Sequence, residues 1–242
     1  MVNKGEVMEL MVYETRQRLY NSYFDVNDKI TIKSILNIFQ DAASYHASKI
    51  GVGYEEMLEK NLYWVLSRIK FDILQQPKID EEVIIKTWPL EKGRIDFDRD
   101  MKISSKEGEV LIIGTSKWCV INSSTRMLER TDNINYIGEI CPDINYTDKF
   151  NKIILPNEEK NFMFNHKVQF SDLDHNQHMN NTNYANLVLN ACERKTISHF
   201  EINFINESKL NDEITVSLIK QENEEYVIGT NNDKIIFVTL VK

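Results

Sequence analysis

Residues 67–85 read SRIKFDILQQPKIDEEVII, and residues 198–216 read SHFEINFINESKLNDEITV. The two segments align without gaps, so that Lys78 matches Lys209 and apolar residues occupy the same positions in both. In each segment the apolar residues recur at every second position on either side of a polar connection, which is typical of a β-hairpin. The chain is therefore predicted to consist of two similar halves.

A second pair of matching segments lies upstream in the same order. Residues 25–29 read DVNDK and residues 174–178 read DHNQH, and each leads into apolar residues at helical spacing. In the first half this stripe comprises Ile35, Ile38, Phe39, Ala42 and His46, with Ser34 as the candidate cap; in the second it runs from Tyr184 to Cys192. Each half is thus predicted to form a strand, a helix and about four further strands.

The predicted fold class is α+β, with one long helix packed on a mostly antiparallel sheet in each half. We expect an N-terminal domain over residues 1–140, a linker over 141–162 and a C-terminal domain over 163–242. The first half holds extra residues near 51–61, between helix and hairpin. The later strands are expected near residues 63–74, 82–89, 94–104 and 109–122, and near 199–207, 212–220, 225–230 and 234–241.

Composition excludes several classes of function. The net charge of the 242 residues is −8, and no long Lys/Arg run is present, which argues against a nucleic-acid binder. No apolar run approaches the ~18 residues of a membrane span. Glu6 and Glu9 stand where a signal peptide would need an apolar core. The three cysteines are far apart and form no CxxC pair, so a cytoplasmic protein with reduced thiols is expected.

Residues 171–184, SDLDHNQHMNNTNY, hold the densest polar cluster of the chain. Asp174, Asn176 and His178 stand at alternate positions and would project to one side if the segment were extended. The helix that follows would point backbone N–H groups at the same spot. A carboxylate, an amide, an imidazole and free N–H donors in one place favour a functional site over a simple turn.

The segment DLDHNQHMNN at residues 172–181 resembles the acyl-acyl carrier protein thioesterases of fatty acid synthesis, as do LYWVLSRIKFDI at 62–73 and SKWCVINSSTRML at 116–128. The resemblance covers almost the whole chain. It implies two tandem hotdog folds and hydrolysis of fatty acyl-acyl carrier protein (acyl-ACP) to a free fatty acid. The implied partners are the acyl thioester and the acyl carrier protein, with no cofactor and no metal.

Residue by residue, the catalytic Asp, Asn and His of that family fall on Asp174, Asn176 and His178 of this chain. A Glu-Cys pair that the family carries after the following strand falls on Glu207 and Ser208. Because a serine replaces the cysteine, a papain-like Cys nucleophile is in doubt here. The resemblance also makes Asn180 and Asn181 candidate substrate-binding residues, and Trp64 a candidate lining residue of an acyl tunnel.

The chemistry of a thioester suggests how these residues would act. The leaving thiol has a pKa of about 8.5, so it departs without much help from an acid. We expect Glu207, aided by His178, to activate a water, Asn176 to position the water or the carbonyl, and Asp174 to orient the others. Backbone N–H groups at the helix start would receive the oxyanion. Attack by Ser208, with His178 as base, is the second option.

The first half serves as an internal control. It keeps Asp25 and Asn27 but has Lys29 in place of His178 and Gln76-Pro77 in place of Glu207-Ser208. We therefore predict one active site per chain, formed by the second half, with the first half shaping the acyl pocket.

Other interpretations stay open at this point. The Asx residues could be only turn and cap residues. A metal site of Asp174, His175 and His178 has no standard zinc spacing, and His46 fits a core histidine. An acyl-CoA thioesterase, a dehydratase of 3-hydroxyacyl thioesters and a non-catalytic acyl-binding module are alternative functions. An acidic carrier would need a basic patch, for which Lys149, Lys152, Lys160 and Lys167 are candidates. A homodimer is compatible with the tandem chain.

Overall fold

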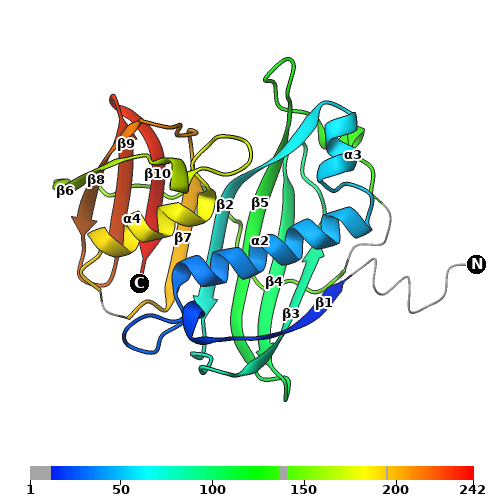
Figure 1. Cartoon of the computed structure of the whole chain (residues 1–242), viewed down its shortest axis with the longest axis horizontal. Helices are drawn as coiled ribbons and strands as arrows, with labels where there is room; N and C mark the ends of the chain where they lie inside the picture. The colour runs from blue at the N-terminus through cyan, green and yellow to red at the C-terminus, as the bar shows by residue number, and fades with distance from the viewer. Residues whose placement is uncertain (1–11, 137–140, 195) are drawn as a thin grey trace, which may run out of the picture. The chain divides into compact units, whose positions relative to one another are not determined.

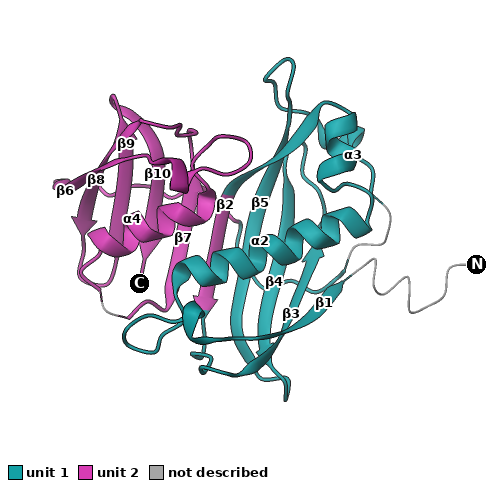
Figure 2. Cartoon of the chain, viewed as in Figure 1, with its two compact units in different colours: residues 1–67, 73–149 teal, residues 68–72, 150–242 magenta. Residues whose placement is uncertain are grey.

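The computed structural model describes residues 12–136, 141–194 and 196–242. The chain divides into two compact units, one of residues 1–67 and 73–149 and the other of residues 68–72 and 150–242 (Figure 2). The division after residue 149 falls inside the predicted linker, and residues 141–160 of that linker form no helix or strand. The predicted limits 1–140 and 163–242 stay predictions, and the short stretch 68–72 was not expected to group with the second half.

The first unit is an antiparallel sheet covered by one long helix. Its strands lie in the order β1-β3-β4-β5-β2, and α2 runs across the face of this sheet (Figure 1). Its elements are β1 (Tyr13–Arg18), η1 (Asn21–Tyr23), α2 (Ile32–Lys49), α3 (Tyr54–Glu59), β2 (Leu62–Ile73), β3 (Glu82–Pro89), β4 (Phe97–Ser105), β5 (Val110–Asn122) and η2 (Thr131–Asn133).

The second unit repeats this arrangement. Its strands follow the order β6-β8-β9-β10-β7, which is the order of the first unit, and α4 contacts β6 and β8. Its elements are β6 (Asn161–Lys167), η3 (Phe170–Asp172), η4 (Asn181–Asn183), α4 (Tyr184–Ala191), β7 (His199–Phe204), β8 (Glu213–Lys220), β9 (Glu225–Asn231) and β10 (Lys234–Val241). The predicted succession of strand, helix and four strands is confirmed in both halves.

Helix α2 buries the stripe that its sequence predicts. Ile35, Ile38, Phe39, Ala42 and His46 are all buried. The predicted cap, however, is wrong: the N-cap is Thr31, whose side chain accepts the N–H of Ser34 at 3.0 Å. Ser34 lies inside the first turn, where its hydroxyl contacts the Thr31 hydroxyl at 2.7 Å. Helix α3 occupies the extra residues of the first half.

Strand β7 ends three residues earlier than predicted, which changes the structural setting of Glu207 and Ser208. The N–H groups of Ile205 and Asn206 both donate to the carbonyl of Ile236, at 2.8 and 3.1 Å. Two consecutive amides that share one acceptor interrupt the regular ladder, because ladder N–H groups alternate in direction, and the strand ends at Phe204. Glu207 and Ser208 therefore lie in the loop after the strand rather than on it.

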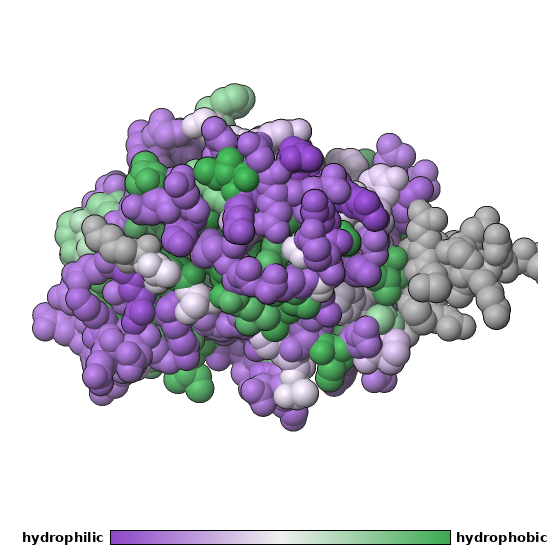
Figure 3. Space-filling model, turned by 90° about the horizontal axis from the view of Figure 1, so that it is seen from below, coloured by the Kyte–Doolittle hydropathy of each residue, from purple (hydrophilic) through white to green (hydrophobic). Residues whose placement is uncertain are grey.

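Helix α4 is short and is fixed by aromatic packing. Tyr184 at its start is buried, and its ring lies edge-on to Phe204 and Phe237, with centroid distances of 5.7 and 5.2 Å. The helix ends at Ala191, so Cys192 is the C-cap and is only half-buried. No helix in the described residues is long and apolar enough to cross a membrane. The face drawn in Figure 3 is mainly hydrophilic, with scattered apolar side chains.

Candidate active site

The polar segment of the second unit is a closed turn rather than an extended strand. Leu173 pairs with Met179, and the N–H of Asp174 donates to the carbonyl of His178 at 2.8 Å. Gln177 adopts a left-handed conformation with φ of 64°. The expectation that three side chains project together from an extended segment is thus wrong, because the Asx residue at its start closes a turn.

The Asp174 carboxylate holds this turn from inside. Its Oδ1 accepts the N–H of Asn176 at 2.8 Å and that of His178 at 3.3 Å. Asp174 therefore fixes the backbone on which His178 stands, and its orienting role in catalysis stays a prediction. Asn176 is exposed on the turn. The turn thus presents the amide of Asn176 to solvent and keeps the carboxylate of Asp174 engaged with its own backbone.

The imidazole of His178 meets the carboxylate of Glu207. The distance from His178 Nε2 to Glu207 Oε2 is 3.2 Å, and the two side chains are 20% and 33% exposed. A backbone bridge between His178 and Lys209 brings the two loops together. A carboxylate and an imidazole that lie within hydrogen-bond distance of each other and are partly exposed to solvent can take a proton from a bound water.

The start of the helix offers fewer free donors than expected. Asn180 Oδ1 accepts both the N–H and the hydroxyl of Thr182 at 2.9 Å, and the carbonyl of Asn180 accepts the N–H of Asn183, also at 2.9 Å. Asn180 is therefore the cap of the 3₁₀ turn that precedes α4, and Asn181 beside it is half-buried. The backbone N–H groups of Thr182 and Asn183 already have acceptors, so they are not available to an oxyanion.

Ser208 faces the interior of the second unit. Its hydroxyl is fully buried and has no partner at hydrogen-bond geometry. Burial raises the pKa of Tyr184 to about 12, and an interaction with Ser208 partly offsets this rise. The backbone carbonyl of Ser208 accepts the N–H of Met179 at 2.8 Å, which ties the loop of Glu207 to that of His178.

Two contributors to the site were not singled out from the sequence. Tyr184 was assigned only to the apolar stripe of the helix, yet its pKa responds to the charges of Glu207 and Asp212. Asp172 accepts the N–H of Asn180 through its carbonyl, and its Oδ2 lies 2.9 Å from His166 Nε2. The sequence feature that could have identified Asp172 is its position two residues before Asp174, at which the Asx turn begins.

The first unit contains the same turn without the same chemistry. Asp25 Oδ1 accepts the N–H groups of Asn27 and Lys29 at 2.8 and 3.0 Å, and Asp28 has φ of 57°. Gln76, the counterpart of Glu207, uses its side-chain oxygen to accept the N–H of Ile30 at 3.3 Å. The carboxylate at the start of the turn is therefore a shared structural feature, whereas the imidazole–carboxylate pair belongs to the second unit.

The first unit contains an apolar pocket of about 550 Å³, a volume that includes its open mouth. Trp64 lines it, with its indole N–H donating to the carbonyl of Val52 at 2.8 Å. Trp118 also lines the pocket, whereas Trp88 is buried in the core. The other lining residues are Ala43, Ser44, Ala47, Ile50, Val52, Pro89, Phe97, Asp98, Arg99 and Tyr136.

The described residues contain no group of three or more His, Cys, Asp or Glu side chains that could hold a metal ion. Of the two groups next to Asp174, His175 is exposed, whereas His178 turns to Glu207.

Comparison with known proteins identifies the family of the chain. Residues 11–136 match the family model "acyl-ACP thioesterase N-terminal domain", and residues 156–235 match "acyl-ACP thioesterase C-terminal domain". The class so defined is that of thioester hydrolases with two hotdog folds. This chain belongs to the acyl-ACP thioesterase family.

Curated relatives come from plants. The chain is 29% identical to oleoyl-acyl carrier protein thioesterase 2, chloroplastic, of Arabidopsis thaliana over 94% of its own length, and 28% identical to the oleoyl-acyl carrier protein thioesterase of Coriandrum sativum over 85%. The matched regions cover 69% and 63% of those relatives. The chain thus spans about two thirds of their length.

Solved structures confirm the tandem hotdog architecture. An acyl-ACP thioesterase from Bacteroides thetaiotaomicron superimposes with a TM-score of 0.83 at 25% identity, covering 100% of this chain and 99% of that one. The 12:0-ACP thioesterase from Umbellularia californica superimposes with a TM-score of 0.80 at 21% identity, covering 96% of each chain, and shows the same fold.

The two Asx turns provide a matched test of the role of Asp174. Asp174→Ala removes the acceptor that fixes the backbone of His178, and we expect kcat/KM for thioester hydrolysis to fall about 100-fold, since a misplacement of about 1 Å can cost that much. Asp25→Ala removes the same two hydrogen bonds in the first unit and should leave kcat/KM unchanged. If both variants lose activity equally while remaining folded by circular dichroism, the assignment of the site to the second unit is wrong.

Proposed function

We propose that this protein hydrolyses the thioester of fatty acyl-ACP and releases a free fatty acid. The observation that carries the proposal is the 3.2 Å contact between His178 Nε2 and Glu207 Oε2, on a turn whose counterpart in the first unit has lysine and glutamine instead. Membership of the acyl-ACP thioesterase family supports the substrate class.

In the proposed reaction a water attacks the thioester carbonyl. Glu207, with His178 beside it, takes one proton from the water as its oxygen bonds to the carbonyl carbon. The tetrahedral intermediate then expels the thiolate, which needs little protonation to leave because the pKa of the thiol is about 8.5. The proton held by the pair passes to the thiolate, and the new carboxylic acid loses its own proton to solvent, so the products are the fatty acid carboxylate, the carrier thiol and one proton.

The remaining residues of the polar segment support this pair. Asp174 keeps the turn closed through two backbone N–H groups, so the imidazole does not have to be ordered when substrate binds. The exposed amide of Asn176 is proposed to orient the water or the carbonyl. Since the N–H groups of Thr182 and Asn183 are occupied, side-chain amides such as Asn176 and Asn181 are the better candidates for oxyanion donors.

Binding of the acyl chain is proposed for the apolar pocket of the first unit. Trp64, Trp118 and Phe97 give it aromatic walls, and Trp64 is fixed by its bond to Val52 and by edge-on contact with Phe97 at 5.0 Å. A pocket with rigid aromatic walls suits a hydrocarbon chain, because most of the binding free energy comes from apolar surface removed from water.

The identity of the acyl carrier, the cellular location and the oligomeric state of the protein are also proposals. Lys149, Lys152, Lys160 and Lys167 are exposed and could receive the acidic carrier protein. Cys119, Cys141 and Cys192 are all free thiols, which fits the proposed cytoplasmic location. A dimer of chains also remains a prediction.

Turnover with two carriers tests the proposed substrate. We expect kcat/KM for a fatty acyl-ACP to exceed that for the same acyl group on CoA, because the surface of an acidic carrier protein is large enough to contact several of the separated lysines at once. The measurement is release of free thiol across a series of chain lengths. Equal or higher kcat/KM with CoA would favour the acyl-CoA alternative, and tight binding without turnover would favour a binding module.

Replacement of the base tests the mechanism. Glu207→Gln removes the proton acceptor and should lower kcat by about 10² to 10⁴. The matched control is Glu222→Gln, which changes an exposed glutamate in the turn between β8 and β9 and should have wild-type kcat. His178→Gln should cost about as much as Glu207→Gln, and the double variant little more, because the two groups act as a unit. Full activity of Glu207→Gln would exclude the proposed base.

Experiments on the buried Ser208 distinguish attack by water from covalent catalysis. Because Ser208 Oγ is fully buried, Ser208→Ala should keep kcat close to the wild-type value. A reaction quenched in the first turnover and analysed by mass spectrometry should show no acyl group on the protein. An acyl ester on Ser208, together with loss of activity in Ser208→Ala, would replace the water mechanism by a serine nucleophile.

A further inference from the structure

One buried cation lines the mainly apolar pocket of the first unit, whose lining also includes Ser44, Asp98 and Tyr136. Arg99 on β4 is 8% exposed, and its side chain belongs to the pocket lining. Burial lowers the pKa of Arg99 to about 10, an effect that Tyr136, also a lining residue, partly offsets. The group stays charged at neutral pH, so the pocket contains a fixed positive charge with little water around it.

Two fully buried neighbours hold the guanidinium in place. Arg99 Nη1 lies 3.0 Å from His46 Nδ1 and donates to Thr87 Oγ1 at 3.1 Å. A guanidinium has only donors, so His46 Nδ1 must be the acceptor and the imidazole is neutral, with its proton on Nε2. His46 and Thr87 are both 0% exposed. The cation is therefore rigid, and neither partner neutralises it.

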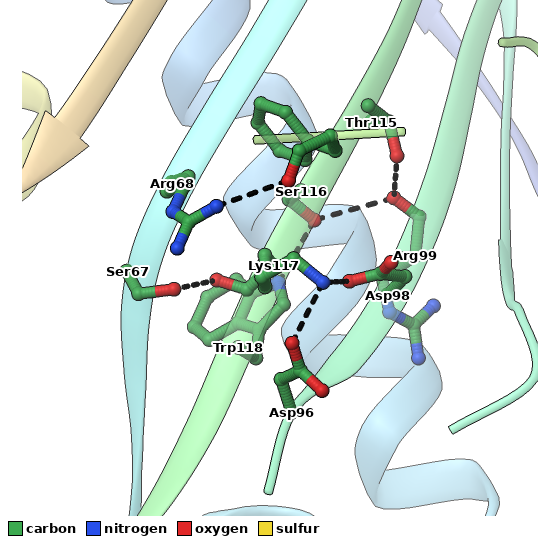
Figure 4. Close-up of polar contacts among 10 residues, drawn as sticks. Ser67, Arg68, Asp96, Asp98, Arg99, Thr115, Ser116, Lys117 and Trp118 are labelled. Carbon is green, nitrogen blue, oxygen red and sulfur yellow. Dashed lines mark hydrogen bonds and ion pairs between the residues drawn. The ribbon is translucent and has the colours of Figure 1, made fainter. Parts of the chain in front are cut away.

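The acidic residues nearest to Arg99 in sequence are engaged elsewhere. Asp96 and Asp98 both form ion pairs with Lys117 Nζ, at 2.8 and 2.6 Å, as Figure 4 shows. Asp100 accepts the backbone N–H of Asn145 at 2.6 Å. Within the described parts of the chain, no carboxylate lies within ion-pair distance of Arg99. A desolvated charge without a counter-ion is costly, and a ligand that supplies a hydrogen-bond acceptor would lower this cost.

Arg99 also marks the end of the pocket along β4. Side chains on one face of a strand alternate, so Phe97, Arg99 and Met101 share a face. Phe97 and Arg99 line the pocket, whereas Met101 is 1% exposed and belongs to the core. On α2 the lining begins at Ala43, one turn after the fully buried Phe39. At the other end, Phe97 joins the apolar cluster of Ile50 and Val52.

We propose that Arg99 is a specificity-determining residue of the acyl pocket, an inference that rests on the proposed function. A plain hydrocarbon chain ends before it reaches the guanidinium, because a terminal methyl group packed there would exclude water and supply no acceptor. An acyl chain that carries a hydroxyl at that depth is favoured, because its oxygen accepts from the free donors of Arg99. The pocket thereby limits the length of plain chains and selects for an oxygenated end.

Substitution of the cation tests this inference through chain-length profiles. Arg99→Met keeps the length of the side chain and removes its charge. With acyl-ACP substrates in two-carbon steps, we expect Arg99→Met to accept plain chains at least one step longer than the wild type does, with a gain of about tenfold in kcat/KM at that step. Arg99→Lys should keep a profile closer to that of the wild type. Arg94→Met, at an exposed position of the same unit, is the matched control and should not change the profile.

Binding to the wild-type protein gives a second test that needs neither a variant nor catalysis. Non-hydrolysable acyl-pantetheine amides with plain and ω-hydroxylated chains can be titrated while the fluorescence of Trp64 and Trp118 reports filling of the pocket. At the longest chain accepted, the ω-hydroxylated amide should bind about tenfold more tightly than the plain one, as one hydrogen bond to a charged donor allows. Short chains should show no difference.

The outcomes separate the two proposals. An unchanged chain-length profile in Arg99→Met, or equal binding of plain and ω-hydroxylated amides at every length, overturns the role of Arg99 and leaves the proposed hydrolysis intact. A wild-type protein that hydrolyses no acyl-ACP, yet prefers the ω-hydroxylated amide, overturns the proposed function and keeps the polar end of the pocket.

Discussion

In each unit one helix covers one face of an antiparallel sheet, and the burial of that face holds the unit together. Ile35 and Phe39 of α2 are fully buried, as are Ala185 and Val188 of α4. Apolar area removed from water contributes about 25 cal/mol per Å². An exposed ion pair such as Lys86–Glu14 contributes only about 0–1 kcal/mol. Because burial fixes helix and strands, it also fixes the loop before each helix, where the polar groups gather.

That loop shows how a duplicated fold can keep its frame and change its chemistry. In both units an aspartate closes the turn by accepting two backbone N–H groups, and the residue three positions later adopts a left-handed conformation. The closed turn needs only the carboxylate of its first residue, which is Asp25 in the first unit and Asp174 in the second. In the first unit, lysine and glutamine stand in place of His178 and Glu207 and the turn is kept, with the side chain of the glutamine, Gln76, accepting the N–H of Ile30.

The two units differ in the polar side chains that they bury. His46 lies on the apolar stripe of α2 and was interpreted as a core histidine, and it is fully buried. Its Nδ1 is also the acceptor that fixes Arg99 at the pocket. In the second unit Tyr184 and Ser208 are both buried, and Ser208 directly follows Glu207 in the chain. In both units a buried polar side chain thus lies next to a charged group, Arg99 in the first and Glu207 in the second.

The sequence by itself determined the duplication, the class of fold and the residues of the polar turn. Periodicity and two aligned blocks suffice for this, because alternation and helical spacing are local properties. The bounds of β3 and β10 agree with the prediction, whereas the cap of α2 and the end of β7 differ from it by three residues, since single hydrogen bonds decide such positions. Only the tertiary structure decided that Ser208 is buried and that Arg99 lines a pocket. These facts depend on contacts between segments far apart in the chain, which no local pattern records.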